Sequence, residues 1–348
     1  MAVTDISLTG QINASGGNYT NDNAMFLKVF SGEVLQAFET ATVMKPLHMV
    51  RTISSGKSAQ FPLTGIATAN YHTPGQDLLT DGSYVSQIKH AEKVISIDDL
   101  LTATTFIDKL DEAKNHYDVR SIYSTELGRA LAREMDKHLI GVALNTAANF
   151  TTNDPVARVN AVSGLPSSTV ITANALGTNG TSDIPDGGVA TFIDSMFDMA
   201  AQFDEKNVPS EERYVVLTPQ SYYNIVNTDE GKDLINRDYN PDPSNSFVNA
   251  QIASVAGFRM IRSNIAAQVY GATVANTGKG DNNYGGLFSR VKAVAFQKQA
   301  FGTVKLLDLA MESEYEIRLQ GHLMVAKYAM GHGALRHECA GVLAGADG

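Results

Sequence analysis

The sequence predicts an α+β fold that is divided into more than one unit. Three patterns indicate this class: a long amphipathic helix at 119–148, alternating helices and strands between 189 and 262, and a β-rich stretch from 304 to 330. A chain of 348 residues exceeds the usual size of one hydrophobic core, so one large or two smaller domains are expected. The apolar content of 43% indicates a folded chain rather than a disordered one.

The helix predicted at 119–148 is the most pronounced local element. About thirty residues would span roughly 45 Å, whereas globular helices average about 11–12 residues. Its charged side is opposite an apolar stripe formed by Tyr123, Leu127, Leu131, Met135, Leu139 and Val142. The stripe is too short and too loosely spaced for a coiled coil, so a single helix packed on a sheet is predicted.

Two β-prone segments, Val50–Gln60 and Val85–Ile97, flank a turn-rich centre. They contain few large apolar side chains, and an isolated two-stranded ribbon is marginally stable in water. We therefore expect a long excursion that another copy of the chain covers.

Residues 1–22 are rich in Gly, Ser, Thr and Asn, and a helix capped by Asn23 is predicted to follow them. Gly32 inside this helix costs about 1 kcal/mol, so the helix is expected to need a surface to pack on. Its apolar stripe consists of Phe26, Phe30, Val34, Phe38 and Ala41. An ordinary core helix is the simplest interpretation.

The rest of the chain alternates between loops and short elements. Residues 150–190 are predicted to be mostly loop. The elements predicted after them are helices at Val189–Lys206 and Pro219–Asn227, a strand at Tyr214–Leu217, a strand–turn–strand at Ile252–Arg262, and strands at Val304–Leu309, Tyr315–Leu319 and Leu323–Met330.

Composition argues against several classes of function. Lys and Arg total 27 against 37 for Asp and Glu, and the net charge of −10 would repel phosphate backbones because no basic run is present. Cys339 is the single cysteine, which excludes an intramolecular disulfide and a thiolate metal cluster. The first residues lack the pattern of a secretory signal, and no apolar run approaches the roughly 20 residues that cross a bilayer.

Motifs that could carry chemistry fail on spacing or context. Gly56-Lys57-Ser58 ends like a phosphate-binding loop, but Arg51 stands where the first glycine belongs. His332, His337 and Glu338 lack the spacing of a zinc-binding helix. We predict no catalytic residue, no cofactor-binding residue and no metal ligand, and therefore no enzyme.

Six blocks resemble the major capsid proteins of T7-like short-tailed phages (podoviruses), in the order in which that family has them. The blocks are FLKVFSGEVLQAF from Phe26, HMVRTISSGKSAQFPLTG from His48, KHAEKVISIDDLLTA from Lys89, NHYDVRSIYSTELG from Asn115, FGTVKLLDLAME from Phe301 and AKYAMGHGALRHE from Ala326. The resemblance is specific over residues 26–130 and 301–338 and weak from about 150 to 284.

The resemblance implies an HK97-like fold with four parts. These are an N-terminal arm at 1–48 that lies on a neighbouring subunit, an extended loop at 49–98, a peripheral domain at 99–165 and 301–348, and an axial domain at 166–300. The peripheral domain would hold the long spine helix and antiparallel strands, and the axial domain would be mixed α/β.

The resemblance also implies a structural role. Copies of the chain would form pentamers and hexamers of an icosahedral head that encloses packaged double-stranded DNA without sequence-specific binding. Expected partners are other copies, a scaffolding protein during assembly and a portal at one vertex, with no membrane. The location would be the virion, assembled in the cytoplasm of the host bacterium. Two alternatives stay open: an encapsulin-like shell of a bacterial compartment and a soluble α/β enzyme.

Charged and aromatic residues are the candidates for contacts between copies. Positive charges on the extended loop are expected to meet carboxylates of a neighbour, which would set the register, while aromatic contacts contribute most of the affinity. The candidates are Phe26, Phe30, Arg51, Lys57, Phe61, Lys89, Lys93, Glu126, Glu134, Glu312 and Glu314.

Overall fold

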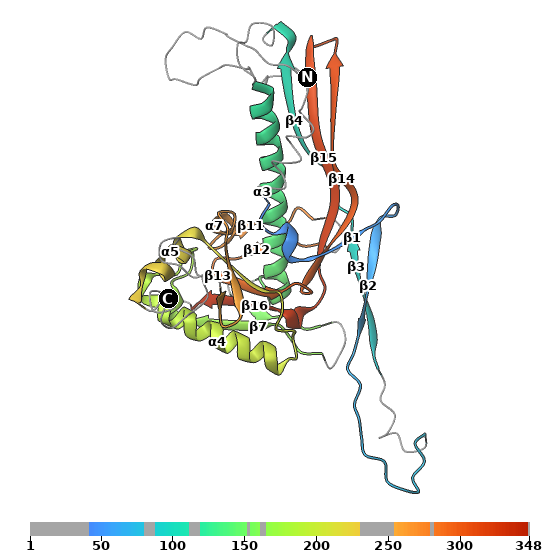
Figure 1. The fold of residues 1–348 in the computed structure, drawn as a ribbon, viewed down its shortest axis with the longest axis vertical. Coiled ribbons are helices and arrows are strands. Elements are labelled where there is room, and N and C mark those ends of the chain that lie inside the picture. Colours follow the sequence, from blue (N-terminus) through green and yellow to red (C-terminus); the bar gives the residue numbers. More distant parts are fainter. Residues whose placement is uncertain are drawn as a thin grey trace. The chain divides into compact units, whose positions relative to one another are not determined.

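The computed structural model describes residues 42–79, 88–110, 119–151, 154–160, 165–229, 254–278 and 282–346 (Figure 1). The predicted helix after Asn23, with Phe26 and Phe30, lies outside these ranges. The described residues form two compact units. Unit 1 comprises 42–46, 97–110, 119–137 and 305–330, and unit 2 comprises 47–79, 88–96, 138–304 and 331–346 within the described ranges. No helix in these ranges has both the length and the hydropathy to span a membrane.

Long antiparallel strands build unit 1. Strand β4 (Leu101–Asp108) pairs with β15 (Gly321–Ala334), from Gly321 opposite Asp108 to Tyr328 opposite Leu101. Strand β14 (Phe301–Glu316) lies on the other side of β15 in the order β1-β14-β15-β4, and Figure 1 shows β4, β15 and β14 side by side. The short edge strand β1 (Met49–Thr52) belongs to unit 2.

The prediction of a separate strand at Tyr315–Leu319 is wrong. Strand β14 continues to Glu316, and the following four residues form the turn into β15. The turn is closed by a hydrogen bond from the Leu319 amide to the Glu316 carbonyl, at 3.2 Å. Gln320 then takes a positive φ of 54°.

Helix α3 (Val119–Ala147) has nearly the predicted bounds. Of its predicted stripe, Leu131 and Met135 are buried in unit 1, and Leu139 and Val142 are buried in unit 2. In unit 1 the buried Asp136 accepts backbone hydrogen bonds from Val43 and Met44, at 2.9 and 3.2 Å. Burial raises the pKa of this carboxyl to about 6, although both hydrogen bonds act in the opposite direction.

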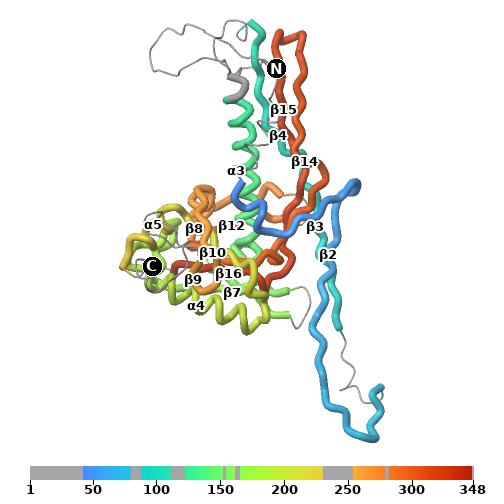
Figure 2. The backbone as a smooth tube through the Cα atoms, viewed as in Figure 1, coloured from blue at the N-terminus to red at the C-terminus, as the bar shows by residue number. Residues whose placement is uncertain are grey.

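A six-stranded mixed sheet forms the core of unit 2 (Figure 2). The strand order is β7 (Thr169–Ala173), β16 (Ala340–Gly345), β13 (Val291–Gln297), β8 (Arg213–Leu217), β10 (Phe258–Arg262) and β9 (Ser254–Val255). β7 and β16 are parallel, as are β8 and β10, and β13 is antiparallel to both of its neighbours. All residues of β13 and β16 are buried, as expected for strands with both faces covered.

The helices of unit 2 agree with the sequence patterns. In α4 (Val189–Glu205) the predicted face of Phe192, Met196, Met199 and Phe203 is fully buried. A Cβ on Gly341 of β16 would lie 2.3 Å from the Met199 sulfur, so α4 lies directly on the sheet (Figure 2). Helix α5 (Pro219–Asn227) has proline in its first turn, and the Thr218 hydroxyl accepts from the Ser221 amide as an N-cap.

Strands β2 (Ser58–Thr64) and β3 (His90–Ser96) form an antiparallel ribbon in unit 2 (Figure 1). The prediction of one strand at Val50–Gln60 is therefore only partly correct. Residues between β1 and β2 turn the chain, and Gly56 has a φ of 117° that favours glycine. The Gly65 amide donates to the Lys89 carbonyl at 2.7 Å and extends the pairing by one residue pair.

Short elements complete unit 2. Strand β7 lies in a stretch predicted as loop, so that prediction missed its β-branched run. The remaining pieces are the strand pairs β5 (Ala148–Asn149) with β6 (Val156–Ala157) and β11 (Thr273–Val274) with β12 (Gly286–Leu287), helix α7 (Ala266–Val269), and short 3-10 turns such as η5 (His337–Cys339).

Candidate intersubunit surfaces

The β2–β3 ribbon has two different faces. Ala59, Leu63 and Ile95 are buried on one face, and Ile95 lies directly against Gly333, whose Cβ would be 2.8 Å from it. Phe61 on the same face is half-buried, and the Arg51 guanidinium lies 5.6 Å from the centre of its ring. Arg51 also donates to the Gln60 carbonyl at 2.7 Å. Two predicted interface residues, Arg51 and Phe61, therefore contact each other within unit 2.

The three predicted lysines of this region have different surroundings. Lys57 is exposed beside the Gly56 turn, and Lys89 is exposed at the end of the ribbon. Lys93 lies opposite Phe61 in the ribbon and is half-buried. Lys93 also lines a cavity of unit 2.

Apolar side chains are exposed on the segment that follows β2. Ile66, Tyr71, Leu78 and Leu79 all lie there, with Tyr71 fully exposed and Leu79 84% exposed. Soluble proteins rarely expose such groups in a cluster unless another molecule covers them. The sequence interpretation did not name these residues, although large apolar side chains in a turn-rich segment are a usable signal.

Three of the predicted carboxylates have partners within unit 1. Glu126 pairs with Arg129 at 2.9 Å and with Arg133 at 3.7 Å, and these groups are about half exposed. Glu134 pairs with Lys137 at 3.6 Å on the same helix, and Glu312 of β14 pairs with Lys327 of β15 at 2.5 Å. Glu314 is exposed on β14.

Unit 1 also exposes large apolar side chains. Ile317 in the β14–β15 turn is 72% exposed, and its neighbour Leu319 is exposed as well. Further exposed residues are Leu100, Leu110, Ile122, Leu307 and Leu323. A unit that folds alone would bury more of this surface, so these side chains mark a second candidate contact region.

The histidines considered as metal ligands have structural contacts instead. Buried His332 joins His48 through Thr303, whose hydroxyl lies 2.7 Å from His332 Nδ1 and 2.6 Å from His48 Nε2. Burial lowers the pKa of His332 far below its usual value, and nearby His48 and His138 lower it further. The ring of His337 donates from Nδ1 to the Thr146 carbonyl at 2.9 Å.

Within the part of the chain that is described, no group of three or more His, Cys, Asp or Glu residues is placed to hold a metal ion. Cys339 is buried, and burial raises the pKa of its thiol to about 12, which keeps it in the weakly reactive protonated form. What the structure offers is surface for contact.

Comparison with known proteins agrees with this architecture. The family model described as Gp10A-like major capsid protein matches residues 60–344. The major capsid protein of Escherichia phage T7 is 37% identical over 335 residues, covering 92% of this chain and 91% of that protein. The major capsid protein of Enterobacteria phage T3 is 36% identical over 356 residues, covering 96% and 95%.

Solved structures give the same result for the fold. The capsid structure of Cyanophage P-SCSP1u matches with a TM-score of 0.70 and 36% identity, covering all of both chains. The mature capsid of bacteriophage PhiM1 matches with a TM-score of 0.66 at 15% identity, which is a likeness of fold. The predicted α+β fold of the HK97-like type is confirmed, and the chain belongs to the Gp10A-like major capsid protein family.

Proposed function

We propose that copies of this chain assemble into pentamers and hexamers that close an icosahedral phage head around double-stranded DNA. The observation that carries the proposal is the match, over nearly the whole chain, to the major capsid proteins of phages T7 and T3. The exposed apolar side chains of both units support it, because a shell subunit needs surface that its neighbours cover. Head-to-tail contacts between identical chains form a closed ring when the rotations from one copy to the next add up to a full turn.

We also propose a division of labour along the chain. Residues 1–48 act as an arm, 49–98 as an extended loop, 99–165 with 301–348 as a peripheral domain, and 166–300 as an axial domain. The contiguous exposed segment after β2 supports the loop assignment, since its apolar side chains need a covering surface. On this proposal Arg51, Phe61 and the lysines of the loop region contact a neighbour.

Net charge and family membership support the proposed interactions of the shell with other molecules. A net charge of −10 supports the proposal that packaged DNA does not adhere to the shell wall and that the wall does not bind DNA sequence-specifically. We also propose that a scaffolding protein takes part in assembly and that a portal occupies one vertex. Assembly takes place in the cytoplasm of the host bacterium. The family places the chain in the virion capsid.

The alternative of a bacterial compartment shell is less well supported. The relatives that are 36–37% identical to this chain are phage capsid proteins. A virus-like particle from Pyrococcus furiosus, with a TM-score of 0.50 and 12% identity, supports the fold alone. The enzyme alternative has no support in the relatives, which are structural capsid proteins.

The test is the size and shape of the assembled product. We expect the expressed chain, supplied with a scaffolding protein of a related phage, to form closed particles visible by electron microscopy and far larger than any small oligomer by light scattering. The same preparation without scaffold should form fewer or irregular particles. A folded chain that stays a small oligomer under both conditions would contradict the proposal.

A further inference from the structure

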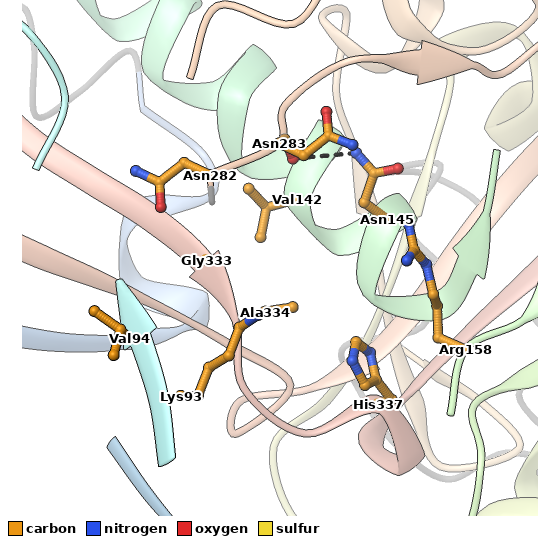
Figure 3. A pocket seen from close by; sticks show the side chains of 10 residues that line it. All are labelled: Lys93, Val94, Val142, Asn145, Arg158, Asn282, Asn283, Gly333, Ala334 and His337. Atoms are coloured by element: carbon orange, nitrogen blue, oxygen red, sulfur yellow. Dashed lines mark hydrogen bonds between the residues drawn. The ribbon is translucent and has the colours of Figure 1, made fainter. Parts of the chain in front are cut away.

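A cavity of about 280 Å³ lies within unit 2, beside strand β3 (Figure 3). Three segments that are distant in sequence supply basic side chains to it: Lys93 from β3, Arg158 from the residue after β6, and His337 from η5. The other lining residues are Val94, Val142, Asn145, Asn282, Asn283, Gly333 and Ala334. Among the described residues, the lining therefore contains two permanent cations and no carboxylate.

The two cations have no countercharge among the described residues. No ion pair joins Lys93 or Arg158 to a carboxylate there, and the guanidinium makes one side-chain hydrogen bond, from Nε to the Ala148 carbonyl at 3.3 Å. Burial lowers the pKa of Arg158, which means that its charge is incompletely compensated.

Buried arginines elsewhere in unit 2 do have carboxylate partners. Arg213 lies 2.6 Å from Asp204, and Arg290 lies 3.1 Å from Asp154. Both arginines are 5% exposed. The half-buried Arg158 therefore differs from Arg213 and Arg290 in having no carboxylate partner among the described residues.

The remaining polar groups hold the cavity in shape. Asn145 donates from Nδ2 to the carbonyls of Asn283 and Gly285, at 3.1 and 3.0 Å, as Figure 3 shows for the first bond. His337 donates from Nδ1 to Thr146, which leaves Nε2 to receive a second proton. Burial lowers the pKa of His337, and the charges of Arg158 and Lys93 lower it further, so a negative group is what would favour its protonation.

Size restricts what can enter. A volume of about 280 Å³ lies just below the roughly 300–1,000 Å³ of pockets for drug-sized molecules. It is suited to the end of one acidic side chain with a few waters. Charge-assisted hydrogen bonds from a guanidinium and an ammonium to a carboxylate are about twice as strong as neutral ones.

We propose that this basic cavity binds the carboxylate of an Asp or Glu side chain from a second copy of the chain. The source follows from composition and assembly: the chain carries 37 acidic residues against 27 basic ones, and its relatives are shell proteins. The inference rests on the proposed shell-building function and names one contact that the function would use. Free phosphate and acetate share the chemistry and serve as probes.

The first experiment tests anion binding by the unassembled, soluble chain. At constant ionic strength, replacing chloride with acetate or phosphate should raise the melting temperature by about 2 °C at roughly ten times the dissociation constant. The shift should disappear in Lys93→Gln and Arg158→Gln and persist in Lys89→Gln, which neutralises an exposed lysine at the end of the same ribbon. Absence of the shift up to about 0.1 M anion, or its persistence in both cavity variants, overturns the proposal.

The second experiment identifies the source of the carboxylate. Shells assembled from equal amounts of ¹⁴N- and ¹⁵N-labelled chains are treated with a carbodiimide, which joins an amine to a carboxylate in direct contact. Mass spectrometry should find Lys93 linked to an acidic peptide with mixed isotope labels. A link with uniform labels only, which joins Lys93 to a carboxylate of its own chain, overturns the proposal.

Assembly itself separates this inference from the proposed function. If wild-type shells form but Lys93 is not linked between copies, the function holds and the inference fails. If the inference holds, Lys93→Gln should weaken assembly roughly 30-fold, and Lys93→Arg, which keeps the charge, should restore much of it. Circular dichroism of the soluble variants shows whether they are folded.

Discussion

The β2–β3 ribbon and the six-stranded sheet belong to the same unit but obtain their stability differently. In the sheet, β13 and β16 are buried along their whole length and α4 covers one side. In the ribbon, burial alternates along β2, and the segment after it exposes Tyr71 and Leu79. The sheet is complete within one chain, whereas the ribbon and its extension leave apolar surface uncovered.

This difference teaches how one sequence can encode both a folded subunit and a shell. Residues that fold the subunit are buried at every position of a strand or along one helix face. Residues that we assign to assembly are apolar in places where the chain itself offers no cover. Substitutions in the two regions should therefore separate folding from assembly.

The largest expected effect is on folding, from a cavity in the sheet layer. Phe192→Ala on α4 removes a side chain that is fully buried, and about 3–5 kcal/mol of unfolding free energy should be lost. The matched control is Phe197→Ala on the same helix, where the side chain is 56% exposed, and a change within about 0.5 kcal/mol is expected. Urea unfolding of the soluble chain measures both, and equal losses would contradict the burial pattern.

The next effect is on assembly, from shortening the ribbon. Replacing residues 66–88 by Asn-Gly should close β2 and β3 with a two-residue turn, because Gly65 and Lys89 are hydrogen-bonded at the end of the pairing. We expect a folded subunit with an unfolding free energy within about 1 kcal/mol of wild type and a near-complete loss of particles. The matched measurement is Tyr71→Ser, a single change on the same segment, which should reduce particle yield less. Unchanged particle yield in the shortened chain would refute the loop assignment.

The third expected effect is a pH dependence of the unfolding free energy, which arises from a buried histidine of the core and not from the ribbon. His332 has a lowered pKa in the folded chain, so below about pH 6.5 the unfolded chain binds more protons and stability falls as the pH drops. The slope is at most about 1.4 kcal/mol per pH unit for one histidine, and His332→Asn should reduce it. His90→Gln, which alters an exposed residue of β3, should leave it unchanged.

Unfolding titrations between pH 5 and 8 measure this slope for each variant. Asp136 contributes in the opposite direction, because its raised pKa of about 6 makes stability fall as the pH rises through about 4 to 6. The difference between variants and wild type is therefore the readout. An unaltered slope in His332→Asn would assign the dependence to other groups, such as His337.

The smallest expected effects come from two carboxylates: Glu126, which has an ion-pair partner in its own chain, and Glu314, which is exposed. Glu126→Gln removes a surface pair with Arg129 and should change the unfolding free energy by less than about 1 kcal/mol. Glu314→Gln should change it even less, but should alter the salt dependence of assembly if a neighbour binds that carboxylate. Light scattering at increasing salt concentration measures this salt dependence of assembly. If it is identical in both variants and wild type, Glu314 is not an interface residue.

Elements with strong local signals were predictable from the sequence. The apolar face of α4 repeats with the helical period, and Thr218 with Pro219 marks the start of α5. The full length of β14 was not predictable, because its second half is exposed and carries little apolar pattern. That part pairs with β15, and such pairing is a tertiary contact that residue periodicity does not report.

The candidate site was predictable only in part, for the same reason. Family resemblance pointed to contact surfaces, and Lys93 was among the residues named. The convergence of Lys93, Arg158 and His337 on one cavity depends on three segments far apart in the chain, so no local pattern encodes it. The pair of Glu312 with Lys327 likewise depends on strand pairing, whereas Glu126 and Arg129 are three residues apart on the predicted helix and could be expected to pair.

The position of β16 has a consequence for biosynthesis. This strand, at residues 340–345, lies between β7 and β13 in the middle of the sheet, so the sheet cannot close until that stretch has left the ribosome. The core of unit 2 is complete only after residues 340–345 have been synthesised, so the chain is not ready to assemble into a shell before that point.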